Sequence, residues 1–556
     1  MAQSLVLGPM NRWASSDEAT VWVETDAACE VEVRPEGAPP ARATTFEVEG
    51  HHYAIVRVSG LPAEAATPYT VLLDGAPVWP EADSPFPPSA LRTNSTRGPA
   101  RIVFGSCRTA YPHEPPYTDQ PDEFDCGREV DALRAIALRM AESDPGDWPH
   151  LVLLLGDQVY ADEVTPDTRE FMRSRRDTSK PPGETIADFE EYTRLYHEAW
   201  SDPPIRWLLS TVPSAMIFDD HDVIDDWNTS ADWVAEMRAK DWWEKRIVGA
   251  FMAYIVYQHW GNLSPEALDQ EDIYQQVNAA RDGGDLLSAY AYKCDREVEG
   301  ARWSYCRDIG TTRVVMIDSR AGRVLDPGRR SMVDAGEWRW ITEHAHGGFD
   351  HLLIGTSLPL IMAPALHYLE AWNEAVCDGA WGRVASRVGE KIRQGVDLEH
   401  WPAFRDSFDA VCELLREVGA GRRGPAPASI VVLSGDVHHA YLAQVGFPQG
   451  SGVTACVWQA TCSPFRNPLS KKERLSVNFG FSRAGHAIGR ALARAAGVPP
   501  PPVRWRFQDG DPRFDNQVGT LELDGRRALA RLERSLPSGR GVEHPILEIA
   551  DEHTLT

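Results

Sequence analysis

The chain has 556 residues, of which 43% are hydrophobic and 25% are charged, a composition typical of folded globular proteins. Its 82 acidic residues outnumber its 56 basic residues and give a formal net charge of −26. This excess opposes non-specific binding to nucleic acids or anionic membranes, because their phosphate groups repel it. It is compatible with a metal site, since carboxylates are good metal ligands.

Nine cysteines are scattered along the chain without paired spacing, which excludes a disulfide framework and a zinc ribbon. The N-terminal segment lacks the charged region and the apolar run of a signal peptide. No apolar run is long enough to predict a membrane span. We therefore expect a cytoplasmic protein without stable membrane insertion, although a precursor that had lost its leader would look the same.

Residues 1–96 carry short runs in which apolar and polar residues alternate, separated by glycine, proline and alanine. Such runs, spaced by roughly 10 to 15 residues, predict an all-β sandwich of the fibronectin or immunoglobulin type. Residues 83–100 are rich in proline and serine without periodicity, so we expect a linker there. We divide the chain into an N-terminal β-sandwich domain at 1–96 and a second domain at 97–556.

After the linker, apolar runs alternate with segments of helical periodicity. Buried strands are expected at 101–107, 151–157, 214–220, 313–318, 351–357 and 429–436. Helices are expected at 128–143, 164–210, 231–260, 336–347, 365–419 and 482–497, and further strands close the chain. This order of strands and helices predicts an α/β domain with a largely parallel sheet.

Four of the predicted strands end in residues that could bind a metal ion. These residues are Cys107 and Arg108; Asp157, Tyr160 and Asp162; Asp219, Asp220, His221, Asp222, Asp225 and Asp226; and Asp436, His438 and His439. Open α/β sheets hold their ligands outside the carboxyl ends of their strands, so we expect the four segments to meet. The acidic stretch 219–226 would repel itself if it were buried without a cation, and a solvated acidic turn is the alternative.

The four segments read GSCR, GDQVYAD, DDHD and SGDVHHA, in this order. As a set, they resemble the motifs of the metallophosphoesterase superfamily and, within it, those of the PhoD-like alkaline phosphatases. The resemblance covers essentially the whole chain. It implies an α/β metallophosphoesterase sandwich behind an N-terminal all-β domain. It also implies hydrolysis of phosphate monoesters or diesters by a hydroxide that two metal ions activate.

The resemblance also implies a set of metal ligands. A ferric ion would be held by Cys107, Asp157, Tyr160 and His438. Calcium or another divalent ion would be held by Asp157, Asp220 and Asp436, with Asp157 bridging the two ions. Asp225 and Asp226 could add ligands for a further ion.

Other residues near these motifs have expected roles outside the metal shell. His221 would protonate the leaving oxygen. Arg108 could hold a phosphate oxygen or form a structural salt bridge. His439 is expected to be structural, because its side chain should face away from His438 on an extended strand. No histidine of the fourth superfamily motif can be placed, although His351, Thr356 and Ser357 lie near a suitable strand.

Three hypotheses remain open from the sequence. The first is an alkaline phosphatase-like enzyme acting on a small phosphate ester. The second is a phosphodiesterase for a lipid headgroup or a nucleotide diester. The third is a non-catalytic binding protein with a vestigial metal site. None of them requires a surface that binds nucleic acid.

Overall fold

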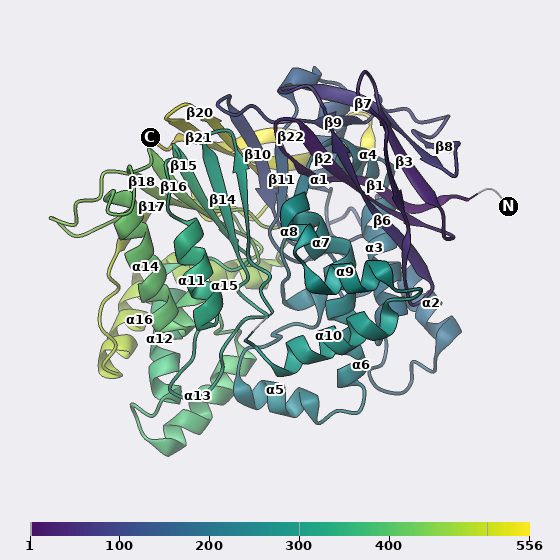
Figure 1. Ribbon diagram of the computed structural model, residues 1–556. Coiled ribbons are helices and arrows are strands. Elements are labelled where there is room, and N and C mark those ends of the chain that lie inside the picture. The colour runs from purple at the N-terminus through teal and green to yellow at the C-terminus, as the bar shows by residue number, and fades with distance from the viewer. Residues whose placement is uncertain (1–2, 300, 509) are drawn as a thin grey trace.

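The computed structural model describes residues 3–299, 301–508 and 510–556 (Figure 1). Its N-terminal part consists of strands in two antiparallel sheets, as expected. One sheet has the order β1-β2-β6-β5, and the other has the order β4-β3-β7-β8 with β9 also pairing with β7. The strands are β1 (Leu5–Ala14), β2 (Glu18–Thr25), β3 (Glu30–Pro35), β4 (Ala41–Thr44), β5 (Phe46–Val48), β6 (His51–Ser59), β7 (Ala66–Leu73), β8 (Ala76–Trp79) and β9 (Ala90–Arg92). Valines of both sheets form a shared apolar core.

The segment predicted as a linker contains a strand. Residues 90–92 form β9 and pair with Ala66–Pro68 of β7, so the prediction of an unstructured linker is wrong there. A strand of three residues is too short to show a periodic pattern in the sequence. The β-region is also attached to the rest of the chain by buried hydrogen bonds. Arg12 donates to the carbonyl of Tyr257 at 2.6 Å, and the Trp22 indole donates to the carbonyl of Val256 at 3.1 Å.

The remaining strands form two mixed sheets. The first has the order β12-β11-β10-β20-β21-β22, and the second has the order β13-β14-β15-β16-β18-β17-β19. Their bounds are β10 (Ala100–Gly105), β11 (Leu151–Leu154), β12 (Ser214–Met216), β13 (Tyr305–Ile309), β14 (Thr312–Ile317), β15 (His351–Thr356), β16 (Ser429–Ser434), β17 (Tyr441–Gly446), β18 (Cys456–Thr461), β19 (Arg504–Phe507), β20 (Gln517–Asp524), β21 (Arg527–Ser538) and β22 (Gly541–Thr554).

One apolar core, drawn from both sheets, lies between them and includes Phe104, Leu153, Leu353 and Leu433. Strands β10 to β12 are mutually parallel, and so are β14, β15, β16 and β18, whereas β13, β17, β19, β20, β21 and β22 pair antiparallel with their neighbours. The prediction of one largely parallel sheet is therefore corrected to two mixed sheets packed face to face. The closing strands β20 and β21 extend the first sheet beyond β10.

Helices surround the two sheets (Figure 1). They are α1 (Ala132–Ala141), α2 (Pro166–Arg175), α3 (Phe189–Ser201), α4 (Pro203–Thr211), α5 (Ala231–Arg238), α6 (Trp243–Ala253), α7 (Trp260–Asn262), α8 (Pro265–Asp269), α9 (Asp272–Ala279), α10 (Gly284–Arg296), α11 (Ala335–His344), α12 (Pro364–Cys377), α13 (Arg383–Gly395), α14 (Arg405–Gly419), α15 (Lys471–Phe481) and α16 (Arg483–Ala495). The tryptophan-rich stretch 231–260 lies mostly in α5, α6 and the π-helix η3 (Tyr254–His259). Trp243, which begins α6, and Trp260, which begins α7, are buried. No helix in the described part of the chain is long and apolar enough to cross a membrane.

Candidate metal centre

Four of the predicted ligands follow strands β10, β11 and β16 in a strained backbone conformation. Cys107, Asp157, Asp436 and His438 have φ angles of 56°, 49°, 66° and 51°. Residues with side chains rarely adopt this left-handed region, and such strain concentrates at functional sites. The turn after β11 also needs Gly156, because a Cβ there would lie 2.6 Å from Oδ2 of Asp219.

Cys107, Asp157 and Tyr160 meet at one buried point. The Cys107 thiol donates to Oδ2 of Asp157 at 3.2 Å, and the Tyr160 hydroxyl lies 3.5 Å from the same oxygen. Ligand atoms of Cys107, Asp157 and His438 all lie within 4.8 Å of one another. Four residues that the sequence placed on three different strand ends are thus brought together.

The chemistry of this donor set fits a cation. Burial, and then the charge of Asp157, raise the pKa of the Cys107 thiol well above its usual range. Burial likewise raises the pKa of the Tyr160 hydroxyl. Burial lowers the pKa of His438 to about 4, which keeps its imidazole neutral, as metal ligation requires. A highly charged ion would supply the positive charge that stabilises a thiolate and a phenolate here.

A second group of donors consists of buried carboxylates. Oxygens of Asp157, Asp219 and Asp220 lie within 4.8 Å of one another. Burial raises the pKa of all three carboxyl groups, and the charges of neighbouring carboxylates contribute to the increase. Asp157 Oδ1 and Asp219 Oδ2 are buried without a hydrogen-bond partner among the described residues. Unpaired buried oxygens at this spacing fit a divalent cation, for which oxygen ligands are preferred.

The sequence marks residues 317–323 as a charged turn at the end of a strand but does not reveal the role of Arg320, which lies beside this carboxylate group. Its side chain is fully buried and pairs with Asp219, with Asp220 at 3.1 Å, with Glu399 at 2.5 Å and with Asp436 at 3.4 Å. Arg320 therefore already engages Asp220 and Asp436, two of the three expected ligands of the divalent ion. Asp219 was not an expected ligand, but it joins Asp157 and Asp220 in this group. Its Oδ2 has no hydrogen-bond partner among the described residues.

His400 was also missed, and it contacts an expected ligand. Its Nε2 lies 3.1 Å from Oδ2 of Asp436, and its Nδ1 lies 2.7 Å from Oε1 of Glu370. His351, which the sequence offered as a possible fourth-motif residue, lies at the start of β15. Its ring nitrogens lie within hydrogen-bond distance of the Ser429 hydroxyl and the carbonyl of Gly525. His400 precedes a short helical turn rather than ending a strand, so the strand-end signal could not reveal it.

His221 lies against Tyr160, with 4.7 Å between the ring centroids. Its Nδ1 is 3.0 Å from Oδ1 of Asp162, and its Nε2 is 3.6 Å from Oδ1 of Asp225. Burial alone would lower the pKa of His221, but the charges of Asp162 and Asp220 outweigh it and raise that pKa well above its usual range. The charge of Asp162 favours the protonated imidazole, and the hydrogen bond to Asp162 orients the ring.

Arg108 does not point at the carboxylate group. Its Nε donates to Asp131, the residue that caps α1, at 2.8 Å, and its guanidinium also donates to the carbonyl of Ala199 at 2.7 Å. These contacts favour the structural salt bridge over the phosphate-binding role. His439 bonds to the carbonyl of Val437 and packs against Tyr441, in line with the structural role expected of it.

Asp226 lies next to the carboxylate group, where its backbone contacts the side chain of Asp220. The Asp226 amide donates to Oδ2 of Asp220 at 3.1 Å. Burial, and then the charge of Glu399, raise the pKa of the Asp226 carboxyl to about 9. Its Oδ1 is buried without a hydrogen-bond partner among the described residues, so a contribution to an additional ion site stays a prediction.

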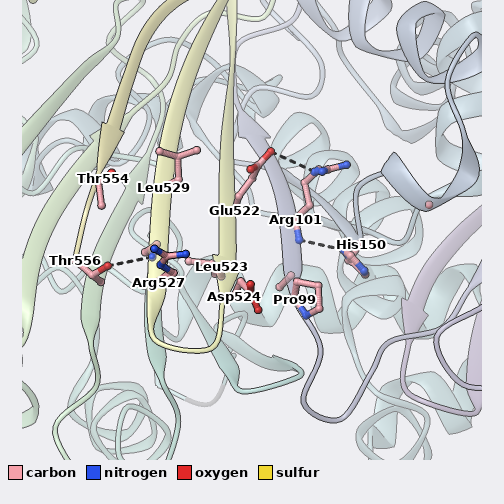
Figure 2. A pocket seen from close by; sticks show the side chains of 13 residues that line it. Pro99, Arg101, His150, Glu522, Leu523, Asp524, Arg527, Leu529, Thr554 and Thr556 are labelled. Atoms are coloured by element: carbon pink, nitrogen blue, oxygen red, sulfur yellow. Dashed lines mark hydrogen bonds and ion pairs between the residues drawn. The ribbon is translucent and has the colours of Figure 1, made fainter.

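A large polar cavity lies away from this centre. It measures about 570 Å³ and is lined by residues that include Arg101, His150, Glu522 and Arg527 (Figure 2). Arg101 lies near the amino end of β10, whereas Cys107 follows its carboxyl end. The cavity is therefore separated from the predicted ligands by the length of the strand.

Comparison with protein-family models finds two matches. Residues 132–287 match the PhoD-like phosphatases, and residues 2–91 match a domain of unknown function (DUF7800). The first match includes Asp157, Tyr160 and His221, whereas Cys107 and His438 lie outside it. It confirms the resemblance seen in the motifs. Comparison with curated proteins finds no match.

Among solved structures, one described as "Structure of PhoD" is similar with a TM-score of 0.58 and 12% sequence identity, covering 99% of this chain and 90% of that chain. At this identity the likeness shows the fold alone. It confirms the predicted fold class, an N-terminal all-β region followed by a mixed α/β domain. "The type III pullulan hydrolase from Thermococcus kodakarensis" has 10% identity and a TM-score of 0.13, covering 97% and 96% of the two chains, and carries no argument.

Proposed function

We propose, from the PhoD-like phosphatase domain that this chain carries, that it hydrolyses phosphate esters at the metal centre described above. The observation that carries the proposal is the convergence of Cys107, Asp157, Tyr160 and His438 beside a buried group of carboxylates with unpaired oxygens. Several carboxylates buried together are costly, and Arg320 supplies only one positive charge to them, so a bound cation would stabilise the group. The same observation disfavours a vestigial site.

We assign the first site to Cys107, Asp157, Tyr160 and His438, with ferric iron as the expected ion. We assign the second site to Asp157 and Asp220 together with Asp219, with calcium or another divalent ion. Asp436, the third ligand expected from the sequence, is held by Arg320 and His400 and stays a candidate. When bound, such a pair of ions supplies positive charge to phosphate oxygens and lowers the pKa of water.

The residues of the chain would then contribute in distinct ways. His221 would be kept protonated by Asp162 and would donate a proton to the leaving oxygen. Asp162 would fix the orientation of that imidazole and the nitrogen that carries the transferable proton. Arg320 would hold Asp219 and Asp220 in place rather than contact the phosphate, because its side chain is fully buried.

Elemental analysis together with turnover tests this proposal. The purified protein should contain iron and a divalent metal, and it should hydrolyse a chromogenic phosphomonoester or phosphodiester. The Asp157→Asn variant should lose both metal and activity, while the Asp524→Asn variant, in the remote cavity, should keep both. Wild-type protein that stays inactive after loading with iron and calcium would overturn the enzyme proposal and favour the binding protein.

Two further expectations also stay proposals. They are the division of the chain into domains between residues 96 and 97, and the location of the protein in the cytoplasm.

A further inference from the structure

Exposed apolar side chains gather on one group of helices. Six of the twelve large apolar side chains that are exposed in the described part of the chain lie on α13, α15, α16 or the loop before α13. They are Trp381, Val384, Val388, Leu475, Phe479 and Ile488. Val384 and Leu475 are the most exposed, at 77% and 72%. Such concentration on one part of a surface marks an interaction site.

The same helices carry exposed cations without counter-ions. On α13, Arg383, Arg387 and Lys391 recur every four residues and therefore share one face with Val384 and Val388. Lys471 and Lys472 begin α15. On α16 the exposed cations are Arg483, Arg490 and Arg494.

None of these eight cations forms an ion pair with another described residue. Glu473 is the only acidic residue between Lys471 and Gly497, and Glu390 of α13 is paired with Arg393. We call the exposed apolar and cationic residues of α13, α15 and α16 the basic helical face.

The three helices share one support. Each of them packs on α12, at the lower left of the molecule in Figure 1. Helix α16 approaches α12 closely at Gly489, where a Cβ would lie 2.8 Å from the carbonyl of Ala365. The Trp381 indole, just before α13, donates to the carbonyl of Ala495 at the end of α16, at 3.1 Å. The three helices therefore form one cluster around α12.

We propose that the basic helical face docks the protein on an anionic lipid surface. Helices that combine Lys and Arg with exposed Leu, Phe and Ile lie in the interface of a bilayer, where the apolar side chains enter it and the cations meet anionic headgroups. The net charge of the whole chain opposes such binding, but charges more than about 10 Å apart are screened at ordinary salt. The positive charge of the basic helical face, rather than the net charge of the chain, therefore determines whether this face binds anionic lipid.

Two other partners fit this face less well. A nucleic acid would satisfy the cations but would leave Leu475, Phe479 and Ile488 without an apolar partner. A second copy of the chain placed face to face would bring like charges together. The lipid surface matches both the charge and the apolar side chains.

Docking in this way would bring lipid close to the metal centre. Between α12 and α15 lies a pocket of about 220 Å³ lined by apolar residues such as Leu366, Leu369 and Val477. Val437 and His439, the two neighbours of His438, also line it. The docked protein would thus place this pocket, beside a predicted ligand, at the lipid.

Vesicle flotation tests the inference without any turnover. The full-length protein is mixed with vesicles of phosphatidylcholine alone or of phosphatidylcholine with phosphatidylglycerol. We expect at least tenfold more protein to float with the anionic vesicles, and this binding to weaken at high salt. Because no hydrolysis is involved, the outcome is independent of the proposed function.

Two variants separate the contributions of the face. Leu475→Ser with Ile488→Ser removes exposed apolar groups, and Arg483→Gln with Arg490→Gln and Arg494→Gln removes charge. Each should reduce flotation at least fivefold and leave hydrolysis of a soluble ester and thermal stability unchanged. Matched controls on other surfaces should float like the wild type. These are Ile546→Ser with Ile549→Ser on β22, and Arg281→Gln with Arg339→Gln and Arg422→Gln.

Several results would overturn the inference. They are equal flotation with both kinds of vesicle, no flotation at all, or variants of the face that float like the wild type. Binding of duplex DNA that is as strong as vesicle binding would favour a nucleic acid. A dimer in light scattering that the variants convert to a monomer, without vesicle binding, would assign the face to self-association.

Discussion

His400 contacts Asp436, with its Nε2 3.1 Å from Oδ2 of that carboxylate. The other ring nitrogen is held by Glu370, whose side chain is fully buried. This arrangement of carboxylate, imidazole and carboxylate fixes the orientation of Asp436 next to the proposed ligands. Partners that orient a metal ligand in this way are important for affinity even though they do not touch the metal.

The His400→Gln variant should therefore bind metal less tightly. We expect a loss of about 10- to 100-fold in affinity, the usual effect of removing such a partner. Competition with a chelator, followed by elemental analysis, measures it. His351→Gln is the matched control, because His351 is also a buried histidine with two hydrogen-bond partners but lies at the start of β15. Equal metal affinity in His400→Gln and wild type would contradict the role given to His400.

Arg320 is expected to stabilise the protein by compensating the buried carboxylates around it. The Arg320→Met variant should lose about 3–5 kcal/mol of unfolding free energy, because it leaves Asp219, Asp220 and Glu399 without their cation. Excess calcium should restore part of this loss by binding the freed oxygens. Denaturant unfolding with and without calcium gives both quantities.

Arg307→Met serves as the control for Arg320→Met. Arg307 is also buried, but it donates to backbone carbonyls such as those of Arg12 and Gly261 rather than to carboxylates. Its removal should destabilise the protein, and calcium should stabilise this variant no more than it stabilises the wild type. If calcium stabilises Arg320→Met no more than Arg307→Met, the oxygens freed by the loss of Arg320 do not bind it.

The sequence allowed part of this site to be predicted and concealed the rest. Cys107, Asp157 and His438 were accessible because each follows an apolar strand. Arg320 also follows a strand, β14, but its significance depends on partners from three other segments, which no local pattern reveals. Glu370 lies on a helix, and only tertiary packing brings it to His400.

The strands of the fold likewise include some that the sequence predicts and some that it does not. Buried strands such as β11 and β16 were predictable because their residues are uniformly apolar. Strand β22 was missed, since it is largely exposed, rich in acidic residues and interrupted by Pro545. Its place at the edge of the first sheet tolerates a proline that an inner strand would exclude. Exposed edge strands lack the apolar pattern by which strands are recognised.

Asp162 is predicted to act on catalysis through His221. In the Asp162→Asn variant, the imidazole would lose its negatively charged partner and its fixed orientation, so kcat should fall by about 10²–10⁴-fold with little change in KM. Steady-state kinetics with a chromogenic ester measures this. Asp225→Asn is the control, because Asp225 is largely exposed and lies 3.6 Å from Nε2 of His221. A similar fall in kcat for both variants would show that Asp162 has no special role.

His51 should make the stability of the protein depend on pH. Its ring nitrogens lie 2.9 Å from Glu24 and 2.8 Å from Glu190, so it joins β6 to α3. Burial opposes protonation, but the hydrogen bonds to Glu190 and Glu24 outweigh it and raise the pKa of His51 to about 9. The folded state therefore binds a proton more tightly than the unfolded state, so this contribution is complete below about pH 6.5 and is lost as the pH rises through about 9.

The His51→Gln variant tests this dependence. Because His51 is partly exposed, we expect the variant to be less stable than wild type by about 1–2 kcal/mol near pH 6, and the difference to shrink to a few tenths near pH 9.5. Denaturant unfolding at both pH values measures the two differences. In a Glu190→Gln background the effect of His51→Gln should be smaller, since one of the two partners is already neutral. A stability difference that is the same at both pH values would mean that the charge of His51 contributes nothing, and that its packing between β6 and α3 accounts for the loss.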